Sequence, residues 1–400
     1  MNDKYNIHLH IFTGKCAPKD FLQVGLNLGD GASSLLKWLF LTKPLSWAIT
    51  KLGGLIPNKT LQFLKIGVMA SQEEVFVNVK NVYDNSAHSG IRIISLSIDM
   101  DYMSDTDKKP AQDFNSQIQE IYKLKKAYPD TLFPFYGVDP RNPDIRNMEN
   151  LIAALESNTF AGIKLYPPNG FFPFDPRLDK LYEYAEANNI PIMTHCTRGG
   201  SYYIGKDVWT VIPDNPPSLN ATHPIMPKII KRIAAYKNAS DKTFRKNAKA
   251  CNLFTHPENY LPVLEKYPKL KLCIAHMGGD IEILGTKNPN IKNAKWFQAA
   301  MLLENSTQSW YDIIKEEILK KYPNTFTDIS YSLSDANCMT KLFDDLNNSR
   351  INEKQILFGT DYFMVTKEDA ELKVVATGEN HLKQFFSPMM SENNKRYLFS

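Results

Sequence analysis

The sequence has 400 residues, of which 43% are hydrophobic and 22% are charged, a balance typical of a globular protein with a large core. The formal net charge is +4 at pH 7, and basic residues are spread along the chain, which argues against a nucleic-acid-binding protein. The five cysteines form no CxxC pair and no disulfide framework, so a reducing compartment is expected.

Short β-like runs alternate with helical stretches along the whole chain. Eight runs have the length and apolar character of buried strands, at residues 5–11, 91–98, 131–138, 161–167, 190–196, 271–277, 324–330 and 354–361. Helical spacing is found between them, for example at residues 113–127, 178–188, 257–266 and 335–347. Eight strands, each followed by a helical stretch, predict an α/β fold whose parallel strands close into a (β/α)8 TIM barrel, with an open doubly wound sheet as the alternative.

The chain is longer than a plain barrel, which needs about 250 residues. Residues 1–400 are expected to form a single barrel domain, with the surplus in three segments that follow strands, at residues 12–90, 197–255 and 278–323. Active-site loops follow the carboxyl ends of barrel strands, so these long loops are expected at the C-terminal face. Residues 12–90 are predicted as a mostly helical insertion between the first and second strands.

One apolar-rich stretch, residues 35–56, resembles a membrane span in composition. Three lysines and a proline interrupt it, so it is predicted as a pair of amphipathic helices. These helices would pack on the barrel or on the second subunit of a homodimer. The first ten residues contain no apolar signal region, so a cytoplasmic protein without a membrane partner is expected.

The candidate site begins with His8 and His10. Alternate residues of a strand share a face, so both imidazoles point the same way. His195, His276 and Asp361 lie at the ends of the fifth, sixth and eighth predicted strands, and in a barrel these ends meet on one rim. Three histidines and one carboxylate suit zinc or another divalent metal, with an open position for a water molecule whose pKa the metal lowers.

Three further residues are candidates for substrate contact. Lys164 and Tyr166 share one face of the fourth strand, and Lys164 would point into the barrel if the flanking apolar residues pack outward. A buried lysine needs a role, and this one could contact substrate, pair with a carboxylate, or be carbamylated and bridge two metals. Arg198 lies on the loop after the fifth strand, where it could bind a substrate carboxylate or be an ordinary surface arginine.

Together, several of these motifs resemble the amidohydrolase superfamily. They are His8-x-His10, GIKLYP (162–167), PIMTHC (191–196), HPENYLPVLEKYPKLKLCIAHMGG (256–279) and ILFGTD (356–361). The set is most similar to the branch that includes aminocarboxymuconate semialdehyde decarboxylase and related aromatic-acid decarboxylases and lactone hydrolases. The motifs occur in the family order over most of the chain, outside residues 14–80 and 197–250.

The resemblance implies a role for each rim residue. His8, His10, His195 and Asp361 would bind one divalent metal, with zinc as the usual ion and manganese as the alternative. His276 would orient or activate the water on that metal, and Asp361 would also take its proton. These roles follow from the family motifs.

Two positions bear on how closely the chain follows the family. The family usually has an aspartate where this chain has Asn6, and an amide keeps a hydrogen bond without the charge. Lys164 matches a position that is carbamylated in relatives with two metals but commonly is not in this branch, so one metal is expected.

Two functional hypotheses follow. The first is a metal-dependent hydrolase that uses an activated water on an amide, lactone or ester bond of a small molecule. The alternative is a metal-dependent decarboxylase, a lyase, of a small aromatic or unsaturated carboxylic acid, with Lys164 and Arg198 as the cationic groups. A nuclease or phosphoesterase is less favoured because no glutamate ends a predicted strand, and a non-catalytic descendant would be expected to bind no metal.

Overall fold

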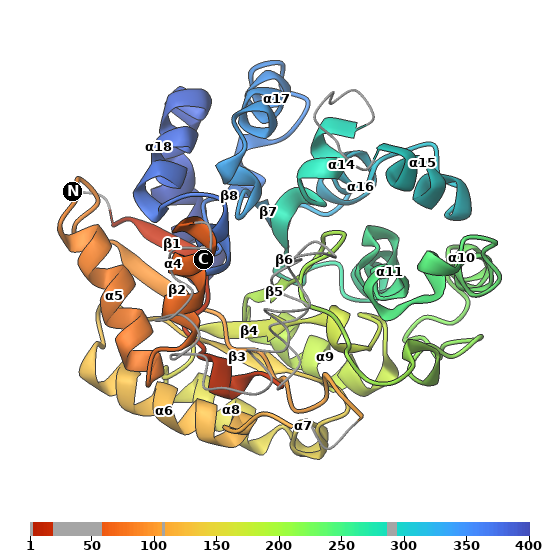
Figure 1. Ribbon diagram of the computed structural model, residues 1–400, viewed down its shortest axis with the longest axis horizontal. Coiled ribbons are helices and arrows are strands. Elements are labelled where there is room, and N and C mark those ends of the chain that lie inside the picture. The colour runs from red at the N-terminus through yellow and green to blue at the C-terminus, as the bar shows by residue number, and fades with distance from the viewer. Residues whose placement is uncertain (1–2, 19–57, 106–108, 286–293) are drawn as a thin grey trace.

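Parallel strands form a ring at the centre of the protein, and helices surround the ring (Figure 1). The structure is a computed structural model that describes residues 3–18, 58–105, 109–285 and 294–400. Within these ranges the strands are β1 (Tyr5–Leu9), β2 (Arg92–Ser95), β3 (Phe135–Val138), β4 (Gly162–Leu165), β5 (Ile192–Thr194), β6 (Leu272–Ile274), β7 (Thr325–Asp328) and β8 (Ile356–Leu357). All eight lie inside the runs predicted from the sequence and are shorter than those runs.

Continuous ladders join β1 to β2 and, in chain order, β3 through β8. Hydrogen bonds and isolated bridges connect the two ladders at both junctions. Between β1 and β8, Ile7 N donates to Phe358 O at 3.2 Å and Asp361 N donates to His8 O at 2.7 Å. Between β2 and β3, Ile93 N donates to Thr131 O at 2.7 Å. The chain therefore forms the predicted (β/α)8 barrel.

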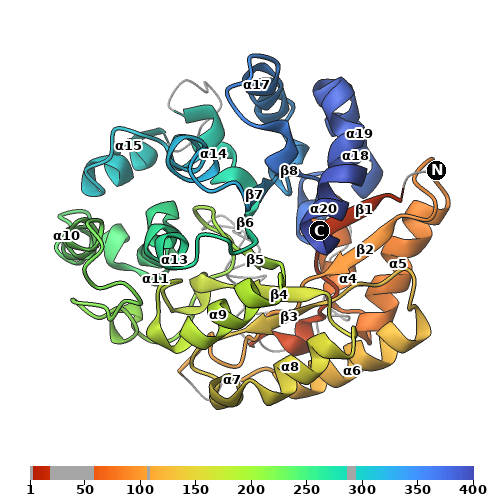
Figure 2. The same ribbon diagram turned by 180° about the vertical axis from the view of Figure 1, so that it is seen from behind.

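The helices form an outer layer around the strands (Figures 1 and 2). Those on the barrel wall are α5 (Gln72–Asp84), α6 (Phe114–Ala127), α8 (Glu149–Glu156), α9 (Asp179–Ala187), α13 (Leu261–Lys266), α16 (Trp310–Ile313), α17 (Ala336–Asn347) and α18 (Glu371–Leu382). The remaining α-helices are α4 (Asn58–Gly67), α7 (Pro143–Asn147), α10 (Met226–Lys237), α11 (Asn247–Ala250), α12 (Asn252–Thr255), α14 (Asp280–Leu284), α15 (Ala294–Leu303), α19 (Phe386–Pro388) and α20 (Asn394–Phe399).

Local sequence signals explain where the wall helices begin and which face they bury. In α6, the Asp113 side chain accepts a hydrogen bond from Ser116 N at 2.8 Å and caps the first turn. Phe114, Ile118 and Ile121 recur at helical spacing and are buried against the barrel. The predicted helix at 113–127 is confirmed in this way.

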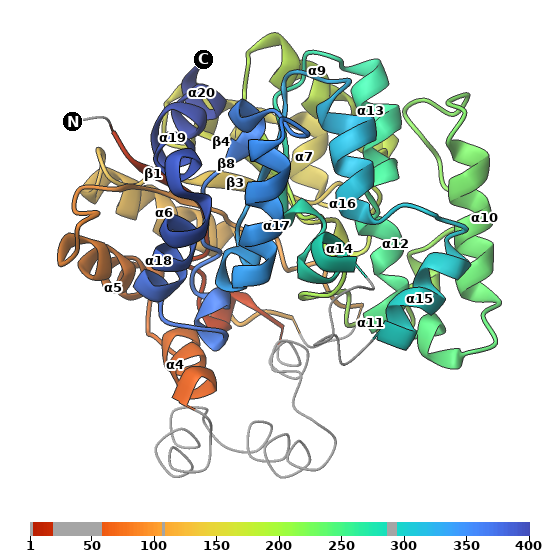
Figure 3. The same cartoon turned by 90° about the horizontal axis from the view of Figure 1, so that it is seen from above.

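The end of the barrel opposite the long loops is closed by α20 (Figure 3). Tyr397 and Leu398 of this helix pack in the interior cluster with Tyr5 and Ile7 of β1. The side chain of Asn394 donates to Tyr5 O and to Phe358 O, both at 2.9 Å. Because this end is filled and hydrogen-bonded, only the opposite rim is open to a ligand.

The described parts of the three long segments follow β1, β5 and β6. Helices α10, α11 and α15, from the segments after β5 and β6, lie beyond the barrel wall on one side (Figure 3). The described part of the 12–90 insertion contains α4 and α5, and the amphipathic helices predicted at 35–56 lie outside the described residues. None of the helices in the described ranges is both long and apolar enough to cross a membrane.

Candidate metal centre

The site begins at β1, where the strand is irregular. The pairing of β1 with β2 shifts register between Asn6 and Leu9. Such an irregularity re-aims side chains, and it lets His8 follow Ile7 toward the barrel interior. His10, two residues later, faces the same way, so the two imidazole rings lie edge to face with centroids 5.6 Å apart.

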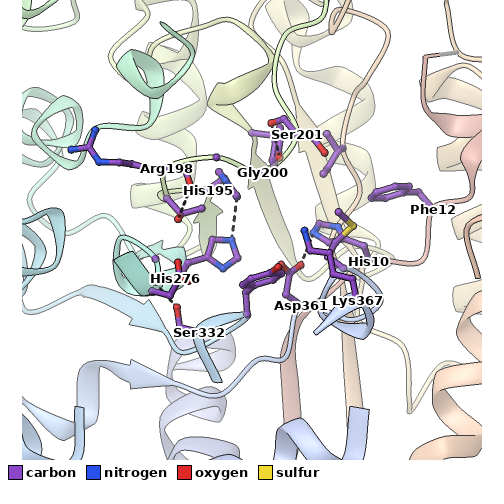
Figure 4. Close-up of a pocket in the computed structure, with 18 of the residues that line it drawn as sticks. His10, Phe12, His195, Arg198, Gly200, Ser201, His276, Ser332, Asp361 and Lys367 are labelled. Atoms are coloured by element: carbon purple, nitrogen blue, oxygen red, sulfur yellow. Dashed lines mark hydrogen bonds and ion pairs between the residues drawn. The ribbon is translucent and has the colours of Figure 1, made fainter. Parts of the chain in front are cut away.

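The structure brings three predicted ligands into one buried group. One nitrogen of His8, one nitrogen of His10 and one carboxylate oxygen of Asp361 all lie within 4.8 Å of one another. His10 Nε2 lies 3.4 Å from Asp361 Oδ1, and His8 Nε2 lies 3.8 Å from the same oxygen. These residues come from β1 and from the turn after β8, which meet at the seam that closes the barrel (Figure 4).

In both His8 and His10, the other ring nitrogen lies beside a group that can only accept a hydrogen bond. His8 Nδ1 lies 2.8 Å from Asp328 Oδ2, and His10 Nδ1 lies 2.9 Å from Leu96 O. A carboxylate and a carbonyl cannot donate, so Nδ1 carries the proton in both rings. The lone pair of each Nε2 is therefore free, which is the tautomer a metal-binding histidine needs.

A hydrogen-bond relay fixes His195 in the same tautomer. His276 Nδ1 lies 3.2 Å from Ser330 O, an acceptor, and so carries the proton of that ring. His276 Nε2 then accepts from His195 Nδ1 at 3.1 Å. This leaves His195 Nε2 with a free lone pair.

The buried atoms without partners are the ones a metal would bind. His8 Nε2, His195 Nε2 and Asp361 Oδ1 are buried and have no hydrogen-bond partner among the described residues. Buried polar atoms rarely remain unsatisfied, so such a set calls for a ligand. Gly200 keeps the approach to His195 open, because a Cβ there would lie 3.2 Å from Nε2. The donor set fits one divalent metal ion.

His195 is less closely placed than the sequence suggested. It lines the same cavity as His10 and Asp361, but it is not in the group whose donor atoms lie within 4.8 Å. Figure 4 shows its ring on the other side of the cavity from His10, with a dashed line that joins it to the ring of His276. Its role as a metal ligand stays a prediction.

Burial makes the imidazoles neutral. Desolvation, followed by the charge of Lys164, lowers the pKa of His8 to about 4. Desolvation and then the charge of His8 lower the pKa of His276 to about 3. Burial is also the main reason why the pKa values of His10 and His195 lie well below the usual histidine value. At neutral pH none of these rings has to lose a proton before it binds a metal.

A second group of His8, His276 and Asp328 has metal-binding atoms equally close together. Its atoms are already used, because Asp328 accepts from His8 and from the backbone N of His276, the latter at 3.0 Å. Burial alone would raise the pKa of Asp328, but the charge and hydrogen bond of His8 outweigh it and hold that pKa below its usual value. The group supports the first site and is not a second one, in agreement with the expectation of one metal.

Lys164 points into the barrel beneath this site. It is 1% exposed, its Nζ has no hydrogen-bond partner among the described residues, and burial lowers its pKa to about 8. Its charge acts on Asp328 and Asp361, and burial raises the pKa of Asp361 to about 8 against the opposing effect of Lys164. Lys164 is not among the described residues that line the cavity, so the geometry supports an electrostatic role over the expected contact with substrate.

Two residues of the site have a left-handed backbone, which is strained for any residue with a Cβ. His276 has φ of 68° and Asp361 has φ of 64°. Each such residue costs about 1–3 kcal/mol unless its surroundings impose it. Here Asp361 N is held by His8 O at 2.7 Å and His276 N by Asp328 at 3.0 Å, so neighbouring strands enforce both conformations.

Asn6 lies on β1 at the position where the family has an aspartate. Its side chain joins a hydrogen-bond network between the strands and the surrounding helices. Its side chain donates to Tyr83 OH at 3.0 Å and to Thr360 Oγ1 at 2.8 Å. Both of those hydroxyls donate to Glu371 of α18, at 2.5 and 2.7 Å. Asn6 thus ties β1 to the strand end that carries Asp361.

Above the metal-binding atoms lies a cavity of about 270 Å³. Its polar lining includes His195, His276 and the backbone of the loop after β5. Its apolar and aromatic lining includes Phe12, Ile98, Met100, Met103, Tyr166, Tyr331 and Met364. Tyr166 is therefore placed where a substrate could touch it, although its hydroxyl is already bonded to Ser201 O at 3.0 Å.

Arg198 corrects an expectation. Its guanidinium forms a bidentate pair with Glu304, at 2.6 Å to each oxygen, and also donates to Glu282. The side chain is 2% exposed and points away from the cavity (Figure 4). The guanidinium joins the loop after β5 to the segment after β6. Arg198 is therefore not a surface arginine, and its charge is not available to a substrate carboxylate.

Sequence reasoning missed the residues that support the ligands. Asp328, Ser330 and Glu371 orient the histidines or the strands that bear them. Asp328 could have been found, because it lies near the carboxyl end of the seventh predicted strand, on the same rim as His195 and Asp361. Glu371 gave no such signal, since it lies at the start of a helix.

The sequence family described as amidohydrolase matches residues 103–379. The chain belongs to the amidohydrolase family. No curated protein matches the sequence. This membership confirms the resemblance that the strand-end motifs indicated. The chain is therefore an enzyme of the amidohydrolase superfamily.

Several solved structures are similar to this chain, and the first of them, with a TM-score of 0.53, shares its fold. The crystal structure of 5-carboxyvanillate decarboxylase from Novosphingobium aromaticivorans, with manganese and 4-hydroxy-3-methoxy-5-nitrobenzoic acid, has a TM-score of 0.53 and 12% identity, covering 99% of this chain and 96% of that one. 4-Oxalomesaconate hydratase from Rhodopseudomonas palustris has a TM-score of 0.46 and 15% identity, covering 99% and 95%. 2,6-Dihydroxybenzoate decarboxylase from Rhizobium has a TM-score of 0.46 and 12% identity, covering 100% and 99%.

The first prediction concerns Asp328. Replacing it by asparagine keeps a hydrogen-bond acceptor but removes the charge that fixes His8, so we expect metal affinity to fall about 10–100-fold. Metal content after dialysis against graded chelator measures this. Asp345→Asn is the matched control, since Asp345 is a buried carboxylate paired with Lys341 on α17. Equal metal retention by both variants would contradict the assignment.

The second prediction concerns Arg198. Arg198→Met leaves two buried glutamates unpaired, so we expect the free energy of unfolding to fall by about 3–5 kcal/mol. Denaturant titration measures the change. Arg177→Met is the control, because its pair with Asp175 is partly exposed and should be worth about 0–1 kcal/mol. Unchanged stability with weakened binding of carboxylic acids would restore the role expected from the sequence.

Proposed function

We propose that this protein is a metal-dependent decarboxylase of a small aromatic or unsaturated carboxylic acid. The observation that carries the proposal is the position of the unpartnered metal-binding atoms at the base of a cavity with an apolar wall. His10 and Asp361 line one part of the cavity, and Phe12, Ile98 and Met103 line another. A small acid with a flat apolar body and one carboxylate matches such a pocket.

The comparison with 5-carboxyvanillate decarboxylase supports this choice over hydrolysis. That enzyme spans nearly the whole of this chain and was solved with manganese and a substituted benzoic acid. Because identity is 12%, the likeness concerns the fold, and the reaction is proposed from the pocket. Zinc and manganese both suit the imidazole and carboxylate donors.

A divalent metal held by His8, His10 and Asp361, with His195 as the fourth ligand, would act as a Lewis acid toward a substrate oxygen. In decarboxylation the carbon–carbon bond to the carboxylate breaks, carbon dioxide leaves, and the carbon that keeps the electron pair takes up a proton. We assign the exchange of that proton to the carboxyl group of Asp361, which lines the cavity together with His10. His276 positions His195 through their hydrogen bond.

Hydrolysis of an amide, lactone or ester bond is the second candidate. The observation that favours it is the carboxylate of Asp361 beside the neutral imidazole of His10, since such a pair can accept a proton from water. The two reactions differ in whether water oxygen enters the product.

The third prediction separates these reactions. Manganese- or zinc-loaded protein is incubated with a panel of hydroxybenzoic acids labelled with ¹³C in the carboxylate, and with aryl lactones and amides, in ¹⁸O-labelled water. We expect labelled carbon dioxide and a product whose ring carbon has gained a solvent proton, without ¹⁸O in that product. Mass spectrometry reads both labels. Incorporation of ¹⁸O into a lactone or amide product, without carbon dioxide release from the acids, would establish hydrolysis.

The fourth prediction concerns His276. His276→Asn removes the acceptor for His195 Nδ1 but none of the three closely placed donors, so we expect metal to be retained and turnover to fall about 10–100-fold. Metal analysis and initial rates are measured together. His88→Asn is the control, because His88 is buried beside Glu379 away from the cavity. Loss of the metal would instead identify His276 as a ligand.

A further inference from the structure

A lysine lies at the cavity beside the metal-binding residues. Lys367 ends the short 3-10 helix Met364–Lys367 that follows β8, and it lines the cavity together with His10 and Asp361. Figure 4 shows its side chain beside these two residues.

The acids next to Lys367 are engaged by other partners. Glu368 accepts a hydrogen bond from Tyr331 OH at 2.5 Å, and Asp369 is paired with Lys59 at 3.5 Å and with Lys373 at 3.8 Å. Across the described ranges, Lys367 has no ion pair and no hydrogen bond. Its Nζ lies 5.1 Å from the centroid of the Tyr331 ring.

The position of Lys367 is fixed by the surrounding structure. Helix α4 packs against the Met364–Lys367 turn, and Lys59 of that helix donates to the backbone oxygen of Glu368. The backbone that carries Lys367 is thus held beside the cavity by α4. A cation that forms no ion pair within 4.0 Å among the described residues can attract an anion from solution.

Lys367 is also the cation that remains once Arg198 is excluded. These two are the lysine and arginine residues among the described lining of the cavity, and Arg198 is neutralised by Glu282 and Glu304. The wall formed by Phe12, Ile98 and Met103 has no charge to offer. A ligand that carried two anionic groups could place one at the metal-binding atoms and the other at Lys367.

We propose that Lys367 determines specificity by binding a second anionic substituent, a carboxylate or phenolate, on an aromatic acid whose first carboxylate lies at the His8, His10 and Asp361 group. The proposal rests on the proposed function for the nature of the site and adds the charge of the substrate. A charge-assisted hydrogen bond of this kind distinguishes a dianionic acid from a monoanionic one of the same shape.

Binding of simple acids tests this without turnover. Isothermal titration calorimetry of the manganese-loaded protein compares benzene-1,3-dicarboxylate with benzoate. We expect the wild type to bind the dicarboxylate more tightly, and Lys367→Met to weaken that binding about 10-fold or more. Benzoate binding should change by no more than about twofold. Lys367→Arg keeps the charge and should keep most of the preference.

Lys373→Met is the matched control, since Lys373 is an exposed lysine of α18 that pairs with Asp369 outside the cavity. It should leave both affinities unchanged, and metal content should be equal in all variants. The inference is overturned if the wild type does not prefer the dicarboxylate or if Lys367→Met retains the preference. A preference that depends on Lys367 without carbon dioxide release from any acid would sink only the proposed reaction.

Discussion

Four hydrogen bonds involving imidazole Nδ1 atoms decide what the centre of this protein can bind. His8, His10 and His276 donate from Nδ1 to acceptor-only groups, and His195 donates to His276. Each bond fixes a tautomer, and three of the rings are left with a lone pair on Nε2 in a buried cavity. Burial keeps these rings neutral, so a metal ion meets lone pairs without competition from protons.

The closure of the barrel is what brings these groups together. His8 and Asp361 are separated by most of the chain, yet Asp361 N donates to His8 O across the β1–β8 seam. The same seam is reinforced from outside by Asn6, Thr360 and Glu371, and from the closed end by Asn394. The ligand geometry therefore depends on the first and last strands being hydrogen-bonded to each other.

Charge is distributed differently on the two sides of the cavity. On one side, Arg198 is consumed by two buried glutamates and holds the segments after β5 and β6 against each other. On the other side, Lys367 faces the cavity while the acids next to it have partners of their own. A basic side chain thus stabilises packing at Arg198, where two buried carboxylates pair with it. At Lys367, where the nearest acids in the sequence have other partners, the basic side chain is left for the ligand that we propose.

The periodicity of apolar residues, the composition and the strand-end motifs were enough to predict the eight strands and the barrel. They also identified His8, His10 and Asp361 as candidate ligands of one metal. They could do so because alternation along a strand and the parallel arrangement fix which side chains reach a common rim. The sequence could not show that Arg198 is buried against Glu282 and Glu304, or that Asp328 and Ser330 set the tautomers. Those contacts join residues far apart in the chain, and only the tertiary structure decides which donor faces which acceptor, because that depends on how the loops and strands pack.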